Sequence, residues 1–244
     1  MERIKKFTGI LLLLFFVTSL NCEAQNQKRW PSFLNREQRP DEVLFLPIPP
    51  DTLSPEFVSD LVWHQWGRRQ RNNEQRAEQA RQEVDLSAKA FCGRLSRLID
   101  AQISEEETPE TAKLINYLVS DATYGTSRAK RHYDRKRPFL QFNDGTLIPE
   151  EEETHHTPSY PSSHASAGWA VALVFTELCP DRQETLLNWG YQFGESRIIA
   201  GYHYRSDVDA GRLTASAIVA RLHADSSFLE QLKKARREIE KLRK

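Results

Sequence analysis

Helical periodicity continues through almost all of the chain after Ser54-Pro55, and it constrains the fold more than any other feature. Ser54 and Pro55 are a favourable N-cap and first-turn pair. Beyond them apolar residues recur at helical spacing as far as the closing SSFLEQLKKARREIEKLRK, while the alternation typical of strands is scarce. We predict an all-α, single-domain helical bundle over residues 51–244, preceded by an irregular, proline-rich arm over residues 25–50.

One long interruption of the helical pattern is predicted over residues 138–163. This stretch, PFLQFNDGTLIPEEEETHHTPSYPSS, is rich in proline and acidic residues. Its adjacent His155-His156 pair has no further partner at metal-ligand spacing, so we predict a solvated loop there and no metal site.

The N-terminus has the pattern of an export signal. A basic MERIKK precedes 14 mostly apolar residues, FTGILLLLFFVTSL, too few for the roughly 20 that cross a membrane. We predict a signal peptide over residues 1–24, with cleavage after Ala24 favoured over acylation of Cys22. The mature protein would be periplasmic or secreted, with no membrane span.

In that oxidising setting Cys92 and Cys179 could form a disulfide, or both could be buried apolar residues.

The charge balance argues against a general nucleic-acid scaffold. The chain has 34 Lys and Arg residues against 34 Asp and Glu residues, and its net charge is zero. Nucleic-acid-binding domains normally carry a basic excess. We predict no nucleic-acid partner.

A first candidate anion site lies in KRHYDRKRP. Lys130 and Arg137 are seven residues apart, so in a continuous helix they would share one face about 10.5 Å apart along the axis. Pro138 would then end the helix. Taken alone, the cluster is better explained as a solvated basic face.

A second candidate site is Ser162-Ser163-His164, at the start of an apolar helical stretch. Either serine would cap that helix, whose unpaired N–H groups can bind phosphate. His164 could protonate a leaving group held there. The simpler alternative is a plain serine cap beside a surface histidine.

A third candidate site combines Arg197, His203 and Asp207. Ser206 and Asp209 resemble a capping box, which predicts a helix start near Asp207. Asp207 would accept a hydrogen bond from one ring nitrogen of His203 and free the other for nucleophilic attack. The planar fork of Arg197 matches phosphate oxygens. An ordinary helix–loop–helix explains the cap but not this combination.

In order along the chain, the three clusters are similar to the three-part signature of the type 2 phosphatidic acid phosphatase (PAP2) superfamily, which includes the vanadium haloperoxidases. The flanking SYPSSHASAGWAVALVFTEL and GYQFGESRIIAGYHYRSDVDAGR resemble the bacterial class A non-specific acid phosphatases. The similarity extends over about residues 45 to 240.

This resemblance implies an exported, metal-independent acid phosphatase that hydrolyses many phosphomonoesters through a phosphohistidine and uses no cofactor. His203 would be the nucleophile, His164 the proton donor and Asp207 the residue that orients the nucleophile. The phosphate-binding residues it implies are Lys130, Arg137, Ser162, Ser163 and Arg197. Expected ligands are phosphomonoesters and inorganic phosphate or vanadate, and a homo-oligomer is usual in the family.

One position departs from the family pattern. Ser163 stands where the family usually has glycine, and a β-carbon there could weaken a backbone contact with phosphate. Two alternatives remain: a vanadium haloperoxidase, which would use the same cations to hold vanadate, and a helical phosphate-binding protein that has lost turnover through Ser163.

Overall fold

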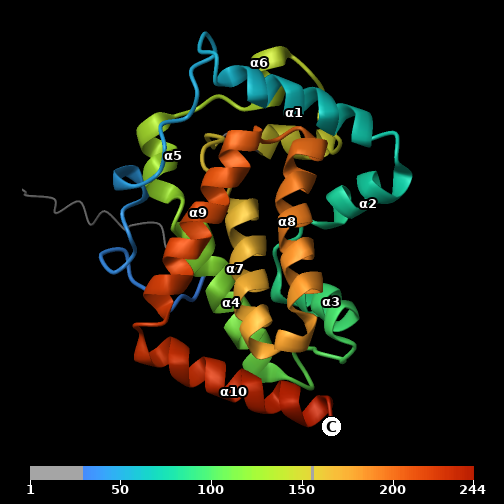
Figure 1. Ribbon diagram of the computed structural model, residues 1–244, viewed down its shortest axis with the longest axis vertical. Coiled ribbons are helices and arrows are strands. Elements are labelled where there is room, and N and C mark those ends of the chain that lie inside the picture. Colours follow the sequence, from blue (N-terminus) through green and yellow to red (C-terminus); the bar gives the residue numbers. More distant parts are fainter. Residues whose placement is uncertain (1–29, 155–156) are drawn as a thin grey trace, which may run out of the picture.

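The computed structural model describes residues 30–154 and 157–244, and these form a helical bundle (Figure 1). Within those residues there is no strand, which confirms the all-α prediction. The α-helices are α1 (Phe57–Gln70), α2 (Glu74–Gln82), α3 (Ala88–Ile99), α4 (Pro109–Tyr124), α5 (Ser127–Tyr133), α6 (Pro138–Phe142), α7 (Ser163–Leu178), α8 (Gln183–Ala200), α9 (Arg205–Leu222) and α10 (Ser226–Leu242). Short 3-10 helices are η1 (Glu42–Leu44), η2 (Pro149–Thr154) and η3 (Pro180–Arg182).

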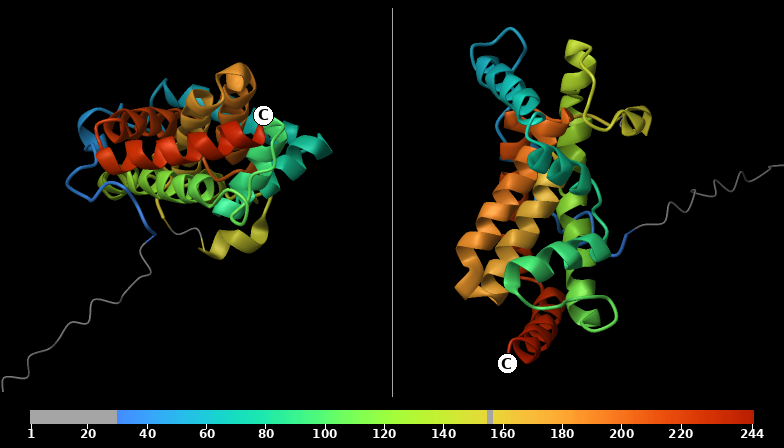
Figure 2. Two further views of the ribbon diagram at one scale, coloured as in Figure 1. Left: turned by 90° about the horizontal axis from the view of Figure 1, so that it is seen from below. Right: turned by 90° about the vertical axis from the view of Figure 1, so that its right-hand side faces the viewer.

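Helix α7 is the centre of the core. It packs against α4, α8 and α9, and α10 packs against α4. Figure 1 shows these helices side by side, with α1 crossing one end of the bundle and α10 the other. Figure 2 shows α10 across that end from two further directions. Gly211 lets α9 approach α7 closely, because a β-carbon there would lie 2.5 Å from the carbonyl oxygen of Ser162. This contact brings the starts of both helices together.

The prediction that Lys130 and Arg137 share one helix face was wrong. Helix α5 ends at Tyr133, and Asp134 follows in the left-handed region with φ 43°. Pro138 begins α6 instead of ending a helix. A proline is well tolerated at the first position of a helix, where its missing N–H has no partner to lose.

The predicted interruption at residues 138–163 is also less irregular than expected, since α6 and η2 lie within it. Upstream, the helical pattern expected after Pro55 is broken by the residues between α2 and α3. Asp85 and Ser87 account for this break, because Asp85 accepts the amide hydrogen of Ser87 and Ser87 caps α3.

Cys92 and Cys179 are buried free thiols in the main core, so the structure favours the buried-residue interpretation. No helix in the described part of the chain is long and apolar enough to cross a membrane. The predicted signal peptide, with Cys22, and the His155-His156 pair lie outside the described residues.

Candidate active site

The three predicted clusters meet at the end of the bundle where α7 begins, α8 ends and α9 begins, beneath α1 (Figure 1). Ser162 is the N-cap of α7, as predicted, and its hydroxyl accepts the amide hydrogen of Ala165 at 3.3 Å. Its own amide donates to the carbonyl of Asp207 at 2.9 Å. The first turns of α7 and α9 are therefore tied directly to each other.

The predicted start of the third helix needs correction. Helix α9 begins at Arg205, two residues earlier than expected, with Tyr204 as its N-cap. Asp207, not Asp209, completes the capping box by accepting the amide hydrogen of Tyr204 at 2.9 Å. Ser206 is not a cap because its hydroxyl donates to Asp60 at 2.6 Å.

His203 is held between a carboxylate and a guanidinium. Its Nδ1 lies 3.3 Å from Oδ2 of Asp207, in agreement with the predicted contact. Its Nε2 lies 3.2 Å from Nη1 of Arg137. Because arginine can only donate, Nε2 accepts this hydrogen bond and Nδ1 carries the proton toward Asp207. The Nε2 lone pair becomes free for nucleophilic attack when Arg137 donates to a bound phosphoryl oxygen instead.

Arg197 is a fully buried cation that forms no side-chain hydrogen bond with any described residue. None of its three guanidinium nitrogens has a hydrogen-bond partner in the described part of the chain. The group lies over the Tyr202 ring, with Cζ 4.9 Å from the ring centroid. Burial lowers the pKa of Arg197 to about 10, so it stays charged at neutral and acidic pH. Isolated buried charges are very costly, so this position is suited to an anionic ligand.

The turn after α8 places His203 beside Arg197. Gly201 ends the helix in the left-handed region with φ 89°, a conformation that favours glycine. Nη2 of Arg71 lies 2.6 Å from the place a β-carbon would take. The amide of His203 donates to the carbonyl of Arg197 at 3.3 Å, so both residues belong to one compact turn.

Lys130 and Arg137 are brought together by the residues just before Tyr160, not by a shared helix. Lys130 Nζ donates to the carbonyl of Pro158 at 2.6 Å, and Arg137 Nε donates to that of Thr157 at 2.8 Å. Burial, then the charge of Arg137, lowers the pKa of Lys130 to about 7, against the opposing effect of Asp207. Lys130 is therefore a cation whose charge depends on pH near neutrality.

Ser163 and His164 form the first turn of α7. The Ser163 hydroxyl lies 2.7 Å from that of Thr126. Ser163 is not among the described residues with positive φ, so a β-carbon at this position causes no backbone strain. His164 Nε2 donates to the carbonyl of Val84 at 3.0 Å, which directs the ring toward the connection between α2 and α3.

Two residues were not predicted from the sequence: Arg135, which contacts Asp207, and Asp60, which contacts Arg135. Nη1 of Arg135 lies 2.6 Å from Oδ1 of Asp207, and Nη2 lies 2.8 Å from Oδ2 of Asp60, with all three side chains almost fully buried. Asp207 therefore binds Arg135 through one oxygen and His203 through the other. Arg135 looks solvated within its basic run, and no local signal links it to Asp60 on α1.

Together these groups can hold a tetrahedral anion against an imidazole, the arrangement that phosphoryl transfer needs. Among the described residues, no group of three His, Cys, Asp or Glu side chains could bind a metal ion. The class of protein that this fold and site define is the PAP2 superfamily, whose family model matches residues 111–229. That range includes every predicted site residue.

Several relatives are similar over most of the chain. The non-specific acid phosphatase of Providencia stuartii is 40% identical over 214 residues, covering 87% of this chain and 86% of the relative. That of Salmonella typhimurium is 34% identical over 229 residues, covering 93% and 91%. The acid phosphatase of Zymomonas mobilis is 34% identical over 205 residues, covering 83% and 77%. The chain belongs to the bacterial non-specific acid phosphatases of the PAP2 superfamily.

Proposed function

We propose that this acid phosphatase hydrolyses a broad range of phosphomonoesters through a phosphohistidine at His203, without a metal ion. The observation that best supports the proposal is the buried, unpaired guanidinium of Arg197 beside His203. A bound tetrahedral dianion would accept the hydrogen bonds of this guanidinium, which no described protein group accepts. Arg137 adds a second cation 3.2 Å from the same imidazole, and Lys130 adds a third whose pKa the charge of Arg137 lowers.

In the proposed first step, Nε2 of His203 attacks phosphorus while the bond from phosphorus to the ester oxygen breaks. His164 gives its proton to the departing oxygen, and Asp207 stabilises the positive charge that develops on the attacking imidazole. The cations, the Ser162 hydroxyl and the N-terminal amide of α7 at Ser163 hold the phosphoryl oxygens.

In the second step, water attacks the phosphohistidine and gives its proton to His164. The bond from phosphorus to Nε2 breaks, inorganic phosphate leaves and His203 returns to its neutral form. The proposed contacts of both steps address the phosphoryl group, which is why a broad range of alcohols is expected to be accepted.

The direct test is hydrolysis of p-nitrophenyl phosphate at pH 5 to 6 in the presence of EDTA. We expect steady turnover that EDTA does not reduce. A parallel assay of bromide oxidation with added vanadate and peroxide should show none. Loss of hydrolysis in EDTA, or no hydrolysis by a protein that still binds phosphate, would contradict the proposal.

The charge of Lys130 should make anion binding weaken as the pH rises. A lysine is charged below its pKa, so with a pKa of about 7 its charge is present in acid and is lost as the pH passes through 7. Arginine keeps its charge throughout this range. We therefore expect the inhibition constant for sulfate, which does not titrate here, to rise between pH 6 and 8 in the wild type. In Lys130→Arg this rise should be smaller by roughly threefold or more.

Lys113→Arg is the matched control for that experiment, since Lys113 is an exposed lysine on α4. It should follow the wild-type curve. Equal pH dependence in Lys130→Arg and the wild type would show that Lys130 does not control anion binding.

We also propose export and self-association. The basic and apolar pattern of residues 1–24 supports a cleaved signal peptide, which the N-terminal sequence of the protein recovered from its host would test.

The proposed homo-oligomer is supported by large apolar side chains that are exposed along the arm, α1 and the residues between them: Leu44, Ile48, Leu53, Val58 and Val62. Light scattering that gives the mass of one chain would exclude it.

A further inference from the structure

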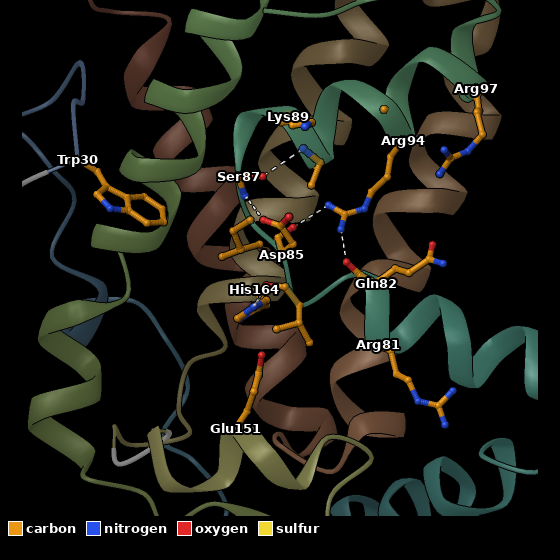
Figure 3. Close-up of a pocket in the computed structure, with 14 residues that line it drawn as sticks. Trp30, Arg81, Gln82, Asp85, Ser87, Lys89, Arg94, Arg97, Glu151 and His164 are labelled. Carbon is orange, nitrogen blue, oxygen red and sulfur yellow. Dashed lines mark hydrogen bonds between the residues drawn. The ribbon is translucent and has the colours of Figure 1, made fainter.

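A cavity of about 1000 Å³ has His164 and Glu151 in its wall (Figure 3). Its volume lies in the range of sites for small organic ligands and far exceeds what a phosphate needs. Under the proposed mechanism, His164 donates to the leaving oxygen. An ester whose phosphorus faces His203 therefore directs its alcohol toward this cavity.

The rest of the cavity wall comes from three segments outside the phosphate site. They are the end of α2 with the connection to α3, the outer face of α3, and Trp30 from the arm. Figure 3 shows Trp30 on one side and Arg81, Arg94 and Arg97 on the other, with His164 between them. Trp30 is 46% exposed, and its amide is anchored to the hydroxyl of Tyr124 at 2.9 Å.

Cations outnumber carboxylates in this wall. The cations are Arg81, Lys89, Arg94 and Arg97, and the carboxylates are Asp85 and Glu151. Glu151 lies at the His164 end of the cavity, with Arg94 and Arg97 further along α3 (Figure 3). An anion at the far end would therefore meet a net positive wall.

Two of these cations are available to a ligand. Arg81 is engaged by Glu74 and Glu78, at 3.4 and 3.3 Å. Arg94 is buried and donates to backbone carbonyls, including that of Asp85 at 2.8 Å. In contrast, Lys89 and Arg97 are exposed and form no ion pair with any described residue.

We propose that this cavity is a leaving-group subsite that favours alcohols carrying a second anionic group, with Lys89 and Arg97 as its anion contacts. The exposed face of Trp30 would pack against an aromatic or sugar ring between the two anions. The inference rests on the proposed function, because it takes the leaving group to lie on the His164 side. It adds a preference to an otherwise broad specificity.

The test compares phenyl phosphate with 4-carboxyphenyl phosphate, two esters that differ only in the distal carboxylate. The measured quantity is the ratio of their kcat/KM values, carboxylated over plain, in low-salt buffer. The Lys89→Gln/Arg97→Gln double variant supplies the baseline for any intrinsic difference in reactivity. Two exposed ion pairs predict a wild-type ratio roughly three- to tenfold above that baseline.

The control is Lys233→Gln, which removes an exposed lysine on α10, a helix that contributes no residue to the cavity wall. Its ratio should equal that of the wild type, and 0.5 M NaCl should bring the wild-type ratio close to the baseline. Equal ratios in the wild type and the double variant would overturn the subsite. If the wild type fails to hydrolyse phenyl phosphate at all, the proposed function itself is wrong.

Discussion

Arg197→Met is expected to make the protein more stable and almost inactive. The guanidinium of Arg197 is fully buried and has no hydrogen-bond partner among the described residues, so no hydrogen bond to them offsets the cost of its desolvation. Replacing it with an apolar side chain of similar length should raise stability in phosphate-free buffer on the order of 2 kcal/mol, or roughly 4–8 °C in Tm. Losing one cation that stabilises the transferring phosphoryl group should lower kcat/KM by about 10²–10³.

Arg135→Met is the matched control because it removes the same charge from another buried arginine. Arg135 is paired with Asp60 and Asp207, at 2.8 and 2.6 Å. Its loss would leave two carboxylates buried without a cation, which should cost about 3–5 kcal/mol of stability. The two variants are therefore expected to shift Tm in opposite directions.

Thermal unfolding with and without inorganic phosphate measures both effects. Phosphate should raise the Tm of the wild type, since a ligand that binds only the folded state stabilises it. In Arg197→Met most of this phosphate-induced shift should disappear. A lower Tm in Arg197→Met without phosphate, or an undiminished shift with it, would mean that Arg197 is a structural residue.

His203→Ala should lower kcat by a factor on the order of 10⁵ or more, because no neighbouring group can replace the attacking nitrogen. Phosphate binding should persist, since Arg137, Lys130 and Arg197 remain in place. Hydrolysis of p-nitrophenyl phosphate and phosphate-dependent Tm are the two measurements. Activity within tenfold of the wild type would exclude His203 as the nucleophile.

The sequence was most informative where the interacting groups lie only a few residues apart along the chain. His203 and Asp207 are four residues apart across a helix start, and Ser162 directly precedes an apolar helix. In both cases the local backbone alone brings the groups together, so their hydrogen bonds could be predicted.

Predictions failed where one local rule competed with another. Pro138 was taken as a helix end, although proline is equally suited to a helix start. Nothing in the sequence indicated that Asp134 adopts the left-handed conformation that ends α5. Lys130 and Arg137 still converge, but through the carbonyls of Thr157 and Pro158. That contact depends on tertiary structure.

Some contacts between distant segments have no signal in the sequence. Asp60 and Arg135 meet only because α1 crosses the end of the bundle, and either residue alone looks like a surface charge. The lack of a hydrogen-bond partner for Arg197 is likewise invisible in the sequence, since it depends on how the described residues around this buried side chain are arranged in three dimensions.

The central claim is that a phosphoryl group is transferred to His203. The most direct measurement is to mix the wild type with a ³²P-labelled phosphomonoester, quench in alkali within milliseconds, and map the labelled peptide. We expect an acid-labile, alkali-stable label on the peptide that contains His203, which forms and decays at rates compatible with turnover. A label on another residue, or turnover with no labelled protein at any time, would contradict the mechanism.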